Sequence, residues 1–299
     1  MSHTYSTKAY AKINLFLRIC GKYPNGYHRL FTLMQEISLA DDIYLTADPD
    51  EEDEIVVANM LPGLKQEDDL CYKAACKYLD KIDAKGYGRI TINVNKNIPS
   101  QAGLGGGSSD AASVIKLLQK RFKNPLTGEE LNELGASLGA DVPFFFTGKS
   151  AFCEGIGEQV TSCRSLAGMH LVMVKPDAGV STPVCFKMCD ESPAVFDEDE
   201  YKRDIKNTLD KEGRAEDRVR ALRDILTNDM QGPACELLPA IDSIIEDMSK
   251  TNPIYTAMSG SGSSVFAIYD SEEERDNALT ALKEIYKDSG YLPVPCETV

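Results

Sequence analysis

Hydrophobic side chains alternate with more polar ones in the first part of the chain, a period of two that is typical of β-strands. Ile13, Leu15 and Leu17 show the pattern, since single residues separate them within a mostly apolar segment. A Pro-Asn-Gly turn signal at residues 24–26 follows this segment. The alternation predicts strands over residues 5–20, 31–39, 43–47, 55–58 and 89–95.

In other segments apolar residues recur every three or four positions, which is the period of an amphipathic α-helix. Val114, Ile115 and Leu118 share one such face, and Asp68 or Asp69 is a suitable cap for an earlier helix. An Asp-Val-Pro sequence at 141–143 is expected to break the helical pattern. The spacing predicts helices over 68–82, 108–122, 128–138, 239–248 and 271–287, a charged helical region at 197–228, and late strands at 151–154, 170–175, 254–258 and 265–269.

The order of these elements predicts an α+β fold. Strands come first, helices cluster after them and strands recur late, which differs from strict βαβ alternation. A length of 299 residues suits one large domain or two medium ones. We expect two domains, residues 1–160 and residues 161–299, with the boundary near residue 160.

The charge of the chain limits its partners. It carries 47 acidic and 32 basic residues, a formal net charge of −15. Proteins that bind nucleic acid or anionic membranes normally have the opposite sign, so neither is an expected partner. A phosphorylated small molecule remains possible if backbone N–H groups, a few cations and a metal ion meet its phosphates locally.

The cysteines and histidines indicate a reduced protein without a structural metal. Nine cysteines at irregular spacing do not form a disulfide framework, and with three histidines a structural zinc site is not expected. Reduced cysteines favour a cytoplasmic location. The first twelve residues lack the apolar core of a signal peptide, and no segment has the apolar length of a membrane span.

The strongest chemical signal is a glycine-rich loop between a predicted strand and a predicted helix. Glycines let the backbone approach a ligand closely, and the helix N-terminus offers unpaired N–H groups and a positive dipole end. Together these features form an anion site suited to ATP phosphates, and a serine hydroxyl there can also meet Mg²⁺ or phosphate. The predicted loop contains Pro99, Ala102, Gly103, Leu104, Gly105, Gly106, Gly107, Ser108 and Ser109.

The loop is not explained well as a flexible linker. Two familiar phosphate-binding motifs, one in this loop and one further along the chain, are excluded by sequence. A merely flexible glycine loop is disfavoured by the strand before it and by the Ser-Ser-Asp sequence, expected to cap the helix after it. A dinucleotide-binding Gly-x-Gly-x-x-Gly motif fails because Ser108 stands where the last glycine belongs. A Walker A motif ending at Lys149 fails because Pro143 occupies its first glycine position.

Lys12 and Asp141 are the candidate pair for phosphoryl transfer. Lys12 lies in an apolar strand, where a buried lysine needs an anionic partner, although it could also be a surface residue. Asp141 stands between a helix end and three phenylalanines, where a cap or a solvated turn is the competing role. A phosphoryl-transfer site needs an acid to accept the hydroxyl proton and a cation to stabilise charge.

At these residues the chain resembles the GHMP kinase superfamily, which includes galactokinase and the homoserine, mevalonate and phosphomevalonate kinases. The residues 99–109 match the family's phosphate loop, Pro-x-x-x-Gly-Leu-Gly-x-Gly-Ser-Ser, and residues 259–264 match its second glycine loop. The resemblance implies the two-domain GHMP kinase fold, with a ribosomal S5-like N-terminal half and a ferredoxin-like α/β C-terminal half. It also implies ATP as phosphate donor, with Mg²⁺.

Three further blocks, 11–17, 26–30 and 139–144, resemble the members of the family that phosphorylate a hydroxyl of a cytidyl diphosphate substrate on the way to isoprenoid precursors. The resemblance implies Lys12 and Asp141 as catalytic residues and Lys96 near the nucleotide. For the substrate it implies Asn14 near the alcohol, and a cytidine pocket from Tyr27, His28 and Phe186 following Thr182 and Pro183.

Two alternatives remain open from the sequence. One is a kinase of the same fold that acts on another small alcohol such as mevalonate or homoserine. It is distinguished by the Gly-Tyr-His block at 26–28, since only a cytidyl substrate needs an aromatic pocket there. The other is an inactive relative that senses a ligand, which would be expected to lose Lys12 or Asp141, and both are present.

Overall fold

The computed structural model describes residues 2–59, 63 and 65–299. The chain forms two compact units made of discontinuous segments. Unit 1 contains the described residues of 1–11, 39–99 and 105–147, and unit 2 contains 12–38, 100–104 and 148–299. The mixed strand and helix content agrees with the α+β fold expected from the sequence. The expected domain boundary near residue 160 stays a prediction.

Two long strands, β1 (His3–Lys22) and β2 (His28–Asp48), pair with each other and contribute residues to both units. The sequence predicted two strands within β2 because Asp41 and Asp42 interrupt its apolar pattern. The strand is nevertheless continuous. The Asp41 side chain is fully buried and accepts hydrogen bonds, so the acid does not need water and the strand does not need to end there.

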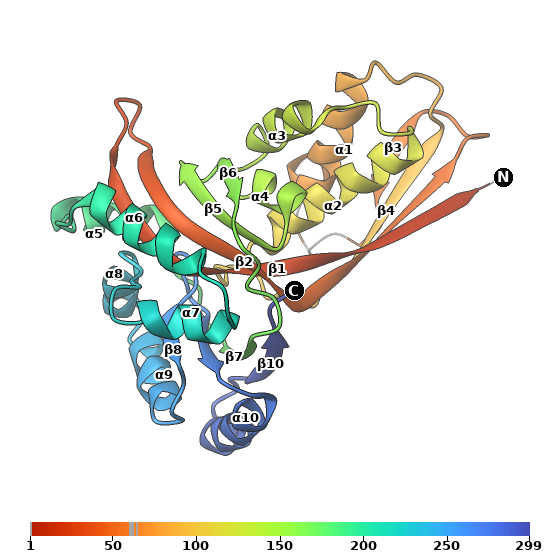
Figure 1. Ribbon diagram of the computed structural model, residues 1–299. Coiled ribbons are helices and arrows are strands. Elements are labelled where there is room, and N and C mark those ends of the chain that lie inside the picture. Colours follow the sequence, from red (N-terminus) through yellow and green to blue (C-terminus); the bar gives the residue numbers. More distant parts are fainter. Residues whose placement is uncertain (1, 60–62, 64) are drawn as a thin grey trace. The chain divides into compact units, whose positions relative to one another are not determined.

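Unit 1 packs its helices against a sheet in which β4 lies between β3 and β2. The C-terminal part of β2 pairs antiparallel with β4, and β3 pairs parallel with β4. Helices α1 and α2 pack against each other, with their apolar faces in one core with the strands (Figure 1). The elements are β3 (Glu54–Val57), η1 (Gln66–Asp68), α1 (Leu70–Lys81), β4 (Arg89–Asn95), α2 (Gly106–Arg121), α3 (Gly128–Ala136) and α4 (Val142–Thr147).

Side chains cap the N-termini of two of these helices, and the Asp69 cap was one of the two predicted from the sequence. Asp69 accepts hydrogen bonds from the amides of Cys71 and Tyr72 and so caps α1, and Thr127 with Glu130 forms a capping box on α3. The short helix α4 was not predicted, since its sequence contains Pro143. Proline is tolerated there because it occupies the first turn, where no intrahelical N–H bond is lost.

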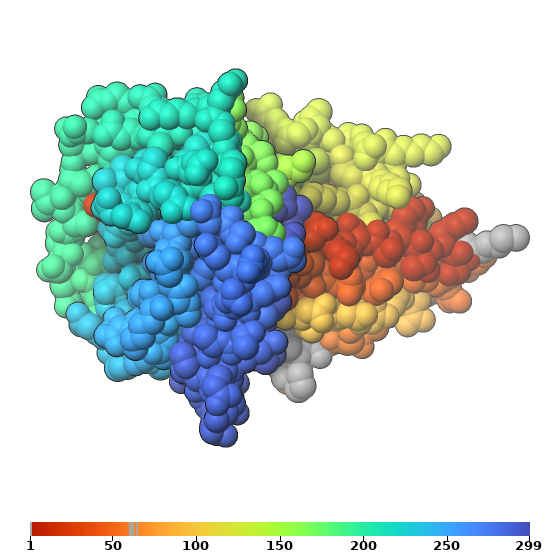
Figure 2. All heavy atoms as spheres, turned by 60° about the horizontal axis from the view of Figure 1, so that its bottom comes forward, coloured from red at the N-terminus to blue at the C-terminus, as the bar shows by residue number. Residues whose placement is uncertain are grey.

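Unit 2 contains a four-stranded antiparallel sheet in the order β10-β7-β9-β8. Helices α9 and α10 pack against this sheet, and Figure 2 shows α10, in dark blue, at the outer surface of the unit. Strand β5 pairs with the N-terminal part of β2 and with β6. The elements are β5 (Ser150–Gly155), β6 (Gln159–Ser162), β7 (His170–Val174), β8 (Tyr255–Met258), α9 (Ala240–Ser249), β9 (Val265–Tyr269), α10 (Glu272–Tyr286) and β10 (Val294–Glu297).

The charged region expected to be helical forms α6 (Glu198–Leu209) and α7 (Ala215–Leu222), each with a buried apolar face. It lies between α5 (Thr182–Glu191) and α8 (Gln231–Leu237) in the chain. Strands β6 and β10 were not predicted, and β10 contains Pro295, which lacks the N–H group that a strand ladder uses. That proline is compatible with a strand at the sheet edge, which β10 occupies. None of the helices over the described residues has the length and apolar character that crossing a membrane requires.

A buried polar network joins α1 to α2 in unit 1 and gives a test of its core. The Tyr78 hydroxyl donates to Gln119 Oε1 at 2.7 Å, and the Gln119 amide also bonds both backbone groups of Leu126, at 2.7 and 3.1 Å. Gln119→Leu leaves all three partners buried and unpaired, so we expect the free energy of unfolding to fall by about 2–4 kcal/mol. Urea unfolding measures this change.

The matched variant is Tyr78→Phe. It removes one hydrogen bond and leaves Gln119 bonded to Leu126, so the expected loss is only about 1 kcal/mol. Equal losses for the two variants would show that the amide of Gln119 does not organise this part of the core.

Candidate active site

The predicted phosphate loop enters α2 without a capping side chain. Gly105 is the N-cap and has a left-handed backbone with φ of 68°. The first helical hydrogen bond runs from Ser109 N to Gly105 O at 2.9 Å. The expected Ser-Ser-Asp cap is therefore wrong: the helix starts at Gly106, and Asp110 lies inside it. The amides of the first turn are available to an anion, and the first turn carries no acid.

The space around each glycine shows why these positions lack side chains. A Cβ on Gly103 would lie 2.1 Å from the Ser259 carbonyl oxygen, so this glycine permits two backbone segments of unit 2 to touch. A Cβ on Gly106 would lie 3.0 Å from a methyl group of Ile98. A Cβ on Gly107 would meet only Leu70, at 4.0 Å, and this glycine is exposed. Gly107 is thus open to a ligand rather than packed against protein.

Asp141 lies directly before α4 in unit 1, and its turn adjoins the phosphate loop. Asp141 is half-buried, and the following Val142 and Phe144 are fully buried. A Cβ on Gly139, in the same turn, would lie 3.9 Å from the hydroxyl of Ser108. Ser108 is half-buried while Ser109 is buried. The structure therefore brings the 139–141 turn together with Ser108, the more accessible of the two loop serines.

Lys96 precedes the loop in the sequence, and its side chain lies between two buried carboxylates of unit 1. Its Nζ donates to Asp110 Oδ2 at 2.7 Å and to Asp41 Oδ2, and it is 3.5 Å from the Cβ position of Gly106. Burial raises the pKa of the Asp110 carboxyl above its ordinary value, although the positive charge of Lys96 opposes this effect. The sequence pattern indicated neither acid.

Lys12 is buried in unit 2 and belongs to a polar chain of hydrogen bonds. Its Nζ donates to Asn14 Oδ1 at 2.6 Å, and Asn14 Nδ2 donates to the Thr32 hydroxyl at 2.8 Å. The Lys12 backbone N–H donates to Leu104 O at 2.9 Å. A Cβ on Gly260 would lie 3.5 Å from Lys12 Nζ. The structure thus brings the predicted catalytic lysine and Asn14 together with both glycine loops of this unit.

The second glycine loop is fixed by residues that the sequence pattern did not single out. Ser259 Oγ donates to Gly103 O at 3.0 Å and accepts from Asn14 N at 3.2 Å. Asn228 Nδ2 donates to the carbonyls of Met258 and Gly260 at 2.9 and 2.8 Å. Asn228 lies in the charged region, where no sequence signal separated it from surface residues. Its two hydrogen bonds hold the loop on both sides of Ser259.

Thr182 lines a polar pocket of about 530 Å³ in unit 2 and hydrogen bonds to the Ser261 hydroxyl at 2.6 Å. The other lining residues come from the segment around Gly179 and from both glycine loops. Pro183 occupies the first turn of α5. The structure therefore joins Thr182 to the glycine loops, while Pro183 contributes to the start of the helix that carries Phe186.

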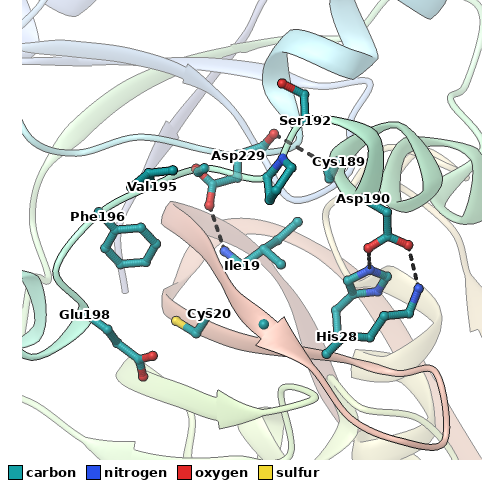
Figure 3. A pocket seen from close by; sticks show the side chains of 14 residues that line it. Ile19, Cys20, His28, Cys189, Asp190, Ser192, Val195, Phe196, Glu198 and Asp229 are labelled. Carbon is teal, nitrogen blue, oxygen red and sulfur yellow. Dashed lines mark hydrogen bonds and ion pairs between the residues drawn. The ribbon is translucent and has the colours of Figure 1, made fainter.

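The predicted aromatic residues also lie in unit 2. The rings of His28 and Phe186 stack, with centroids 4.3 Å apart and planes at 8°. Asp190, one turn further along α5, accepts from His28 Nε2 at 2.7 Å and from Lys22 at 2.5 Å (Figure 3). These bonds, from Lys22 first and then His28, hold the pKa of Asp190 below its ordinary value. Tyr27 is 60% exposed, so its ring is open to solvent.

A second pocket, of about 460 Å³, lies in unit 2 and has His28 in its lining (Figure 3). Ile19, Cys20, Phe196 and Asp229 line it together with His28. Asp229 accepts from the Ile19 amide at 2.7 Å, and burial raises the pKa of the Cys20 thiol to about 11, so the thiol stays protonated at neutral pH. The Cys20 thiol is therefore a weak nucleophile at neutral pH.

The predicted site residues therefore fall into two sets, each assembled within its own unit. Unit 1 holds Lys96, Asp141 and the end of the phosphate loop that starts α2. Unit 1 also holds Pro99, and unit 2 holds Lys12, the loop residues 100–104 and the predicted substrate residues: Asn14, Tyr27, His28, Thr182, Pro183 and Phe186.

Comparisons with known proteins agree with this description. Residues 69–149 match the model of the GHMP kinases N terminal domain, and residues 209–288 match that of the GHMP kinases C terminal. The chain is 37% identical over 289 residues to a 4-diphosphocytidyl-2-C-methyl-D-erythritol kinase of Clostridium acetobutylicum, covering 94% of this chain and 96% of that protein.

Solved structures show the same fold. A crystal structure of 4-(cytidine 5'-diphospho)-2C-methyl-D-erythritol kinase matches with a TM-score of 0.76 and 29% identity, covering 98% of this chain and 99% of the other. A homoserine kinase from Cytophaga hutchinsonii matches with a TM-score of 0.74 at 15% identity, covering 99% and 95%, and shows the fold alone. By its two domain matches and its near full-length similarity, the chain belongs to the GHMP kinase family of ATP-dependent small-molecule kinases.

Proposed function

We propose that this kinase transfers the γ-phosphate of ATP to the 2-hydroxyl of 4-diphosphocytidyl-2-C-methyl-D-erythritol, a step of the non-mevalonate route to isoprenoid precursors. The observation that carries the substrate class is the aromatic group in unit 2, in which His28 stacks on Phe186 and Tyr27 offers an exposed ring. A cytosine ring has π faces for such side chains and a polar edge for hydrogen bonds. The near full-length similarity to enzymes named for this substrate supports the same assignment.

In the proposed mechanism Asp141 accepts the proton of the substrate hydroxyl, and Lys12 stabilises negative charge on the transferring group. Asp141 belongs to a turn in which the Cβ position of Gly139 lies 3.9 Å from the Ser108 hydroxyl, so its carboxyl belongs to a segment next to the loop proposed to hold the phosphates. Lys12 is buried and hydrogen-bonded to Asn14, which limits its mobility and favours a fixed position for its charge. Asn14 is proposed to orient the alcohol.

Phosphate binding is assigned to the loop that opens α2, where the amides after Gly105 carry no capping side chain. Mg²⁺ is expected with ATP, and when bound it neutralises charge on the phosphate oxygens. Mg²⁺ in kinases uses substrate phosphates, water and few protein oxygens. The hydroxyl of Ser108 fits that role. No cluster of three or more His, Cys, Asp or Glu side chains suited to a metal occurs within residues 2–59, 63 and 65–299.

Three further expectations from the sequence stay predictions. These are the cytoplasmic location, the absence of nucleic acid and membrane partners, and the assignment of residues 1–160 to ATP binding and catalysis and 161–299 to substrate binding. All nine cysteines are free thiols, which is compatible with a reducing compartment.

The phosphate-loop assignment predicts a selective loss of ATP binding in Gly107→Val. Gly107 has open space and an ordinary backbone, so the variant is expected to fold, but its side chain blocks the approach of phosphates to the amides. We expect the Kd for ATP to rise at least about tenfold, measured by calorimetric titration. Gly105→Val is a poorer choice because the left-handed backbone of Gly105 would be strained.

Gly128→Val is the matched control. Gly128 is also in the first turn of a helix and also has open space around it. Unchanged ATP affinity in the Gly107 variant, or equal losses in both variants, would refute the loop assignment.

Asp141→Asn tests the general base. The amide has the same shape but cannot accept the proton, so we expect kcat to fall roughly 10²–10⁴-fold while the Kd for ATP changes little. Steady-state kinetics with coupled ADP detection gives kcat and KM separately. A rise in KM without a fall in kcat would make Asp141 a binding residue, and an unchanged kcat would leave it a structural turn residue.

Phe186→Ala tests the substrate class. Loss of one base–aromatic contact, worth roughly 1–3 kcal/mol, should raise KM for the cytidyl substrate by about 5–150-fold and leave KM for ATP nearly unchanged. Val184→Ala is the control, because Val184 is exposed on the same helix. The unmodified enzyme is assayed against mevalonate and homoserine in parallel. Turnover of one of these alcohols without turnover of the cytidyl compound would overturn the proposal.

A further inference from the structure

Asp41 is a fully buried carboxylate in β2, and the nearby Ala40 and Ile43 of the same strand are buried apolar residues. Its Oδ1 accepts the backbone N–H of Asn97 at 2.5 Å and that of Ile98 at 2.8 Å. Its Oδ2 accepts from Lys96 Nζ. A buried charge is costly unless it is compensated, and here one carboxylate meets two amides and an ammonium.

The three groups bonded to Asp41 belong to consecutive residues, which immediately precede the phosphate loop. Strand β4 ends at Asn95, so residues 96–98 have left the sheet ladder and have no strand partner to fix them. Asn97 Nδ2 adds a bond to the Ala40 carbonyl at 2.8 Å, beside Asp41 in β2. The position at which the backbone enters the loop is thus set by one carboxylate and its neighbour.

Asp41 also reaches the far end of the loop through Lys96. The Lys96 ammonium bridges Asp41 to Asp110 on α2, and it lies 3.5 Å from the Cβ position of Gly106. The Lys96 side chain is 31% exposed, whereas both carboxylates are nearly or fully buried. The chain before the loop and the helix after it are therefore tied to the same two acids. All of these contacts lie within unit 1.

We propose that Asp41 is a positioning residue for ATP: it fixes the entry of the phosphate loop directly, and fixes the first turn of α2 through Lys96 and Asp110. The proposal rests on the phosphate-binding role proposed for the loop. Asp41 touches neither ATP nor the reacting hydroxyl in this assignment. It determines how precisely the loop amides are arranged before ATP arrives, and a pre-arranged site loses less free energy on binding.

A purely structural role is the competing hypothesis, since a buried acid in a strand also stabilises the fold. The two roles differ in what they affect. A structural role predicts a loss of stability and of active enzyme, with unchanged KM values for the enzyme that remains folded. A positioning role predicts weaker binding of ATP by folded enzyme, with the affinity for the alcohol substrate unchanged.

Asp41→Asn is the test variant because it preserves the size of the side chain and one acceptor for the two amides, but removes the charge opposite Lys96. We expect the Kd for ATP, measured by calorimetry on the folded full-length chain, to rise about tenfold. KM for ATP should rise in parallel, while KM for the alcohol changes less than about twofold. Thermal unfolding and circular dichroism establish that the variant is folded.

Asp42→Asn is the matched control. Asp42 is the next residue of the same strand, and over the described chain its side chain makes no hydrogen bond to residues 96–98. The substitution is identical, so its ATP affinity should match that of the unmodified enzyme. A second variant, Asp110→Asn, keeps Asp41 and removes only the far end of the bridge, so it should weaken ATP binding by a smaller factor than Asp41→Asn.

The outcomes separate this proposal from the function proposed above. Unchanged ATP affinity in Asp41→Asn overturns the positioning role, as does an equal loss in Asp42→Asn. If Asp41→Asn does not fold, an unchanged ATP affinity in Asp110→Asn overturns it. Failure of Gly107→Val to weaken ATP binding would instead remove the loop assignment itself. Because ATP titration needs no alcohol, none of these results depends on the identity of the second substrate.

Discussion

Close approach of the backbone at Gly103 is the constraint on which the glycine loops of unit 2 depend. A Cβ atom on residue 103 would lie only 2.1 Å from the Ser259 carbonyl oxygen, so only glycine fits there. The Ser259 hydroxyl also donates a hydrogen bond to the Gly103 carbonyl. The same serine accepts the amide of Asn14, in the strand that carries Lys12. One missing side chain therefore allows three distant segments to be hydrogen-bonded together, and the lysine is fixed as a consequence.

Both units contain a network of hydrogen-bonded buried polar groups. Lys12 bonds to Asn14, and Asn14 to Thr32, whose hydroxyl donates to the carbonyl of Phe16. In unit 1 the ammonium of Lys96 meets two buried carboxylates in the same way. Such networks cost free energy if any member is removed, because its partners stay buried without a hydrogen bond. This makes them suited to holding functional groups in place.

The sequence predicted most of the helices and strands, and failed where tertiary contacts override a local signal. Asp41 and Asp42 suggested a break in β2, but the Lys96 partner of Asp41 lies 55 residues away along the chain. Strand β10 was missed because it contains Pro295, which disfavours a strand in a sequence-based prediction. Neither hydrophobic periodicity nor residue propensity shows that β10 lies at the sheet edge, where proline is tolerated. The strand, glycines and helix around residues 99–109 were predictable because they form a local sequence pattern. Asn228 was not predictable, because it bonds to the second glycine loop through partners remote in the chain and has no diagnostic neighbour sequence.

The acidity of the chain fits the proposal that phosphates bind mainly to backbone groups of the loop. With a net charge of −15, the long-range field of the protein repels ATP, so attraction has to be local. Lys96 cannot supply it by charge alone, because its ammonium is hydrogen-bonded to Asp41 and Asp110, and two acids beside one cation leave no surplus positive charge. The partial positive charge of the amides at the start of α2 is not offset in this way, because no side chain caps these amides and the first turn contains no acidic residue. Under the proposed assignment the cluster contributes geometry and the helix start contributes the attraction, so the precision of the loop matters more than the number of cations around it.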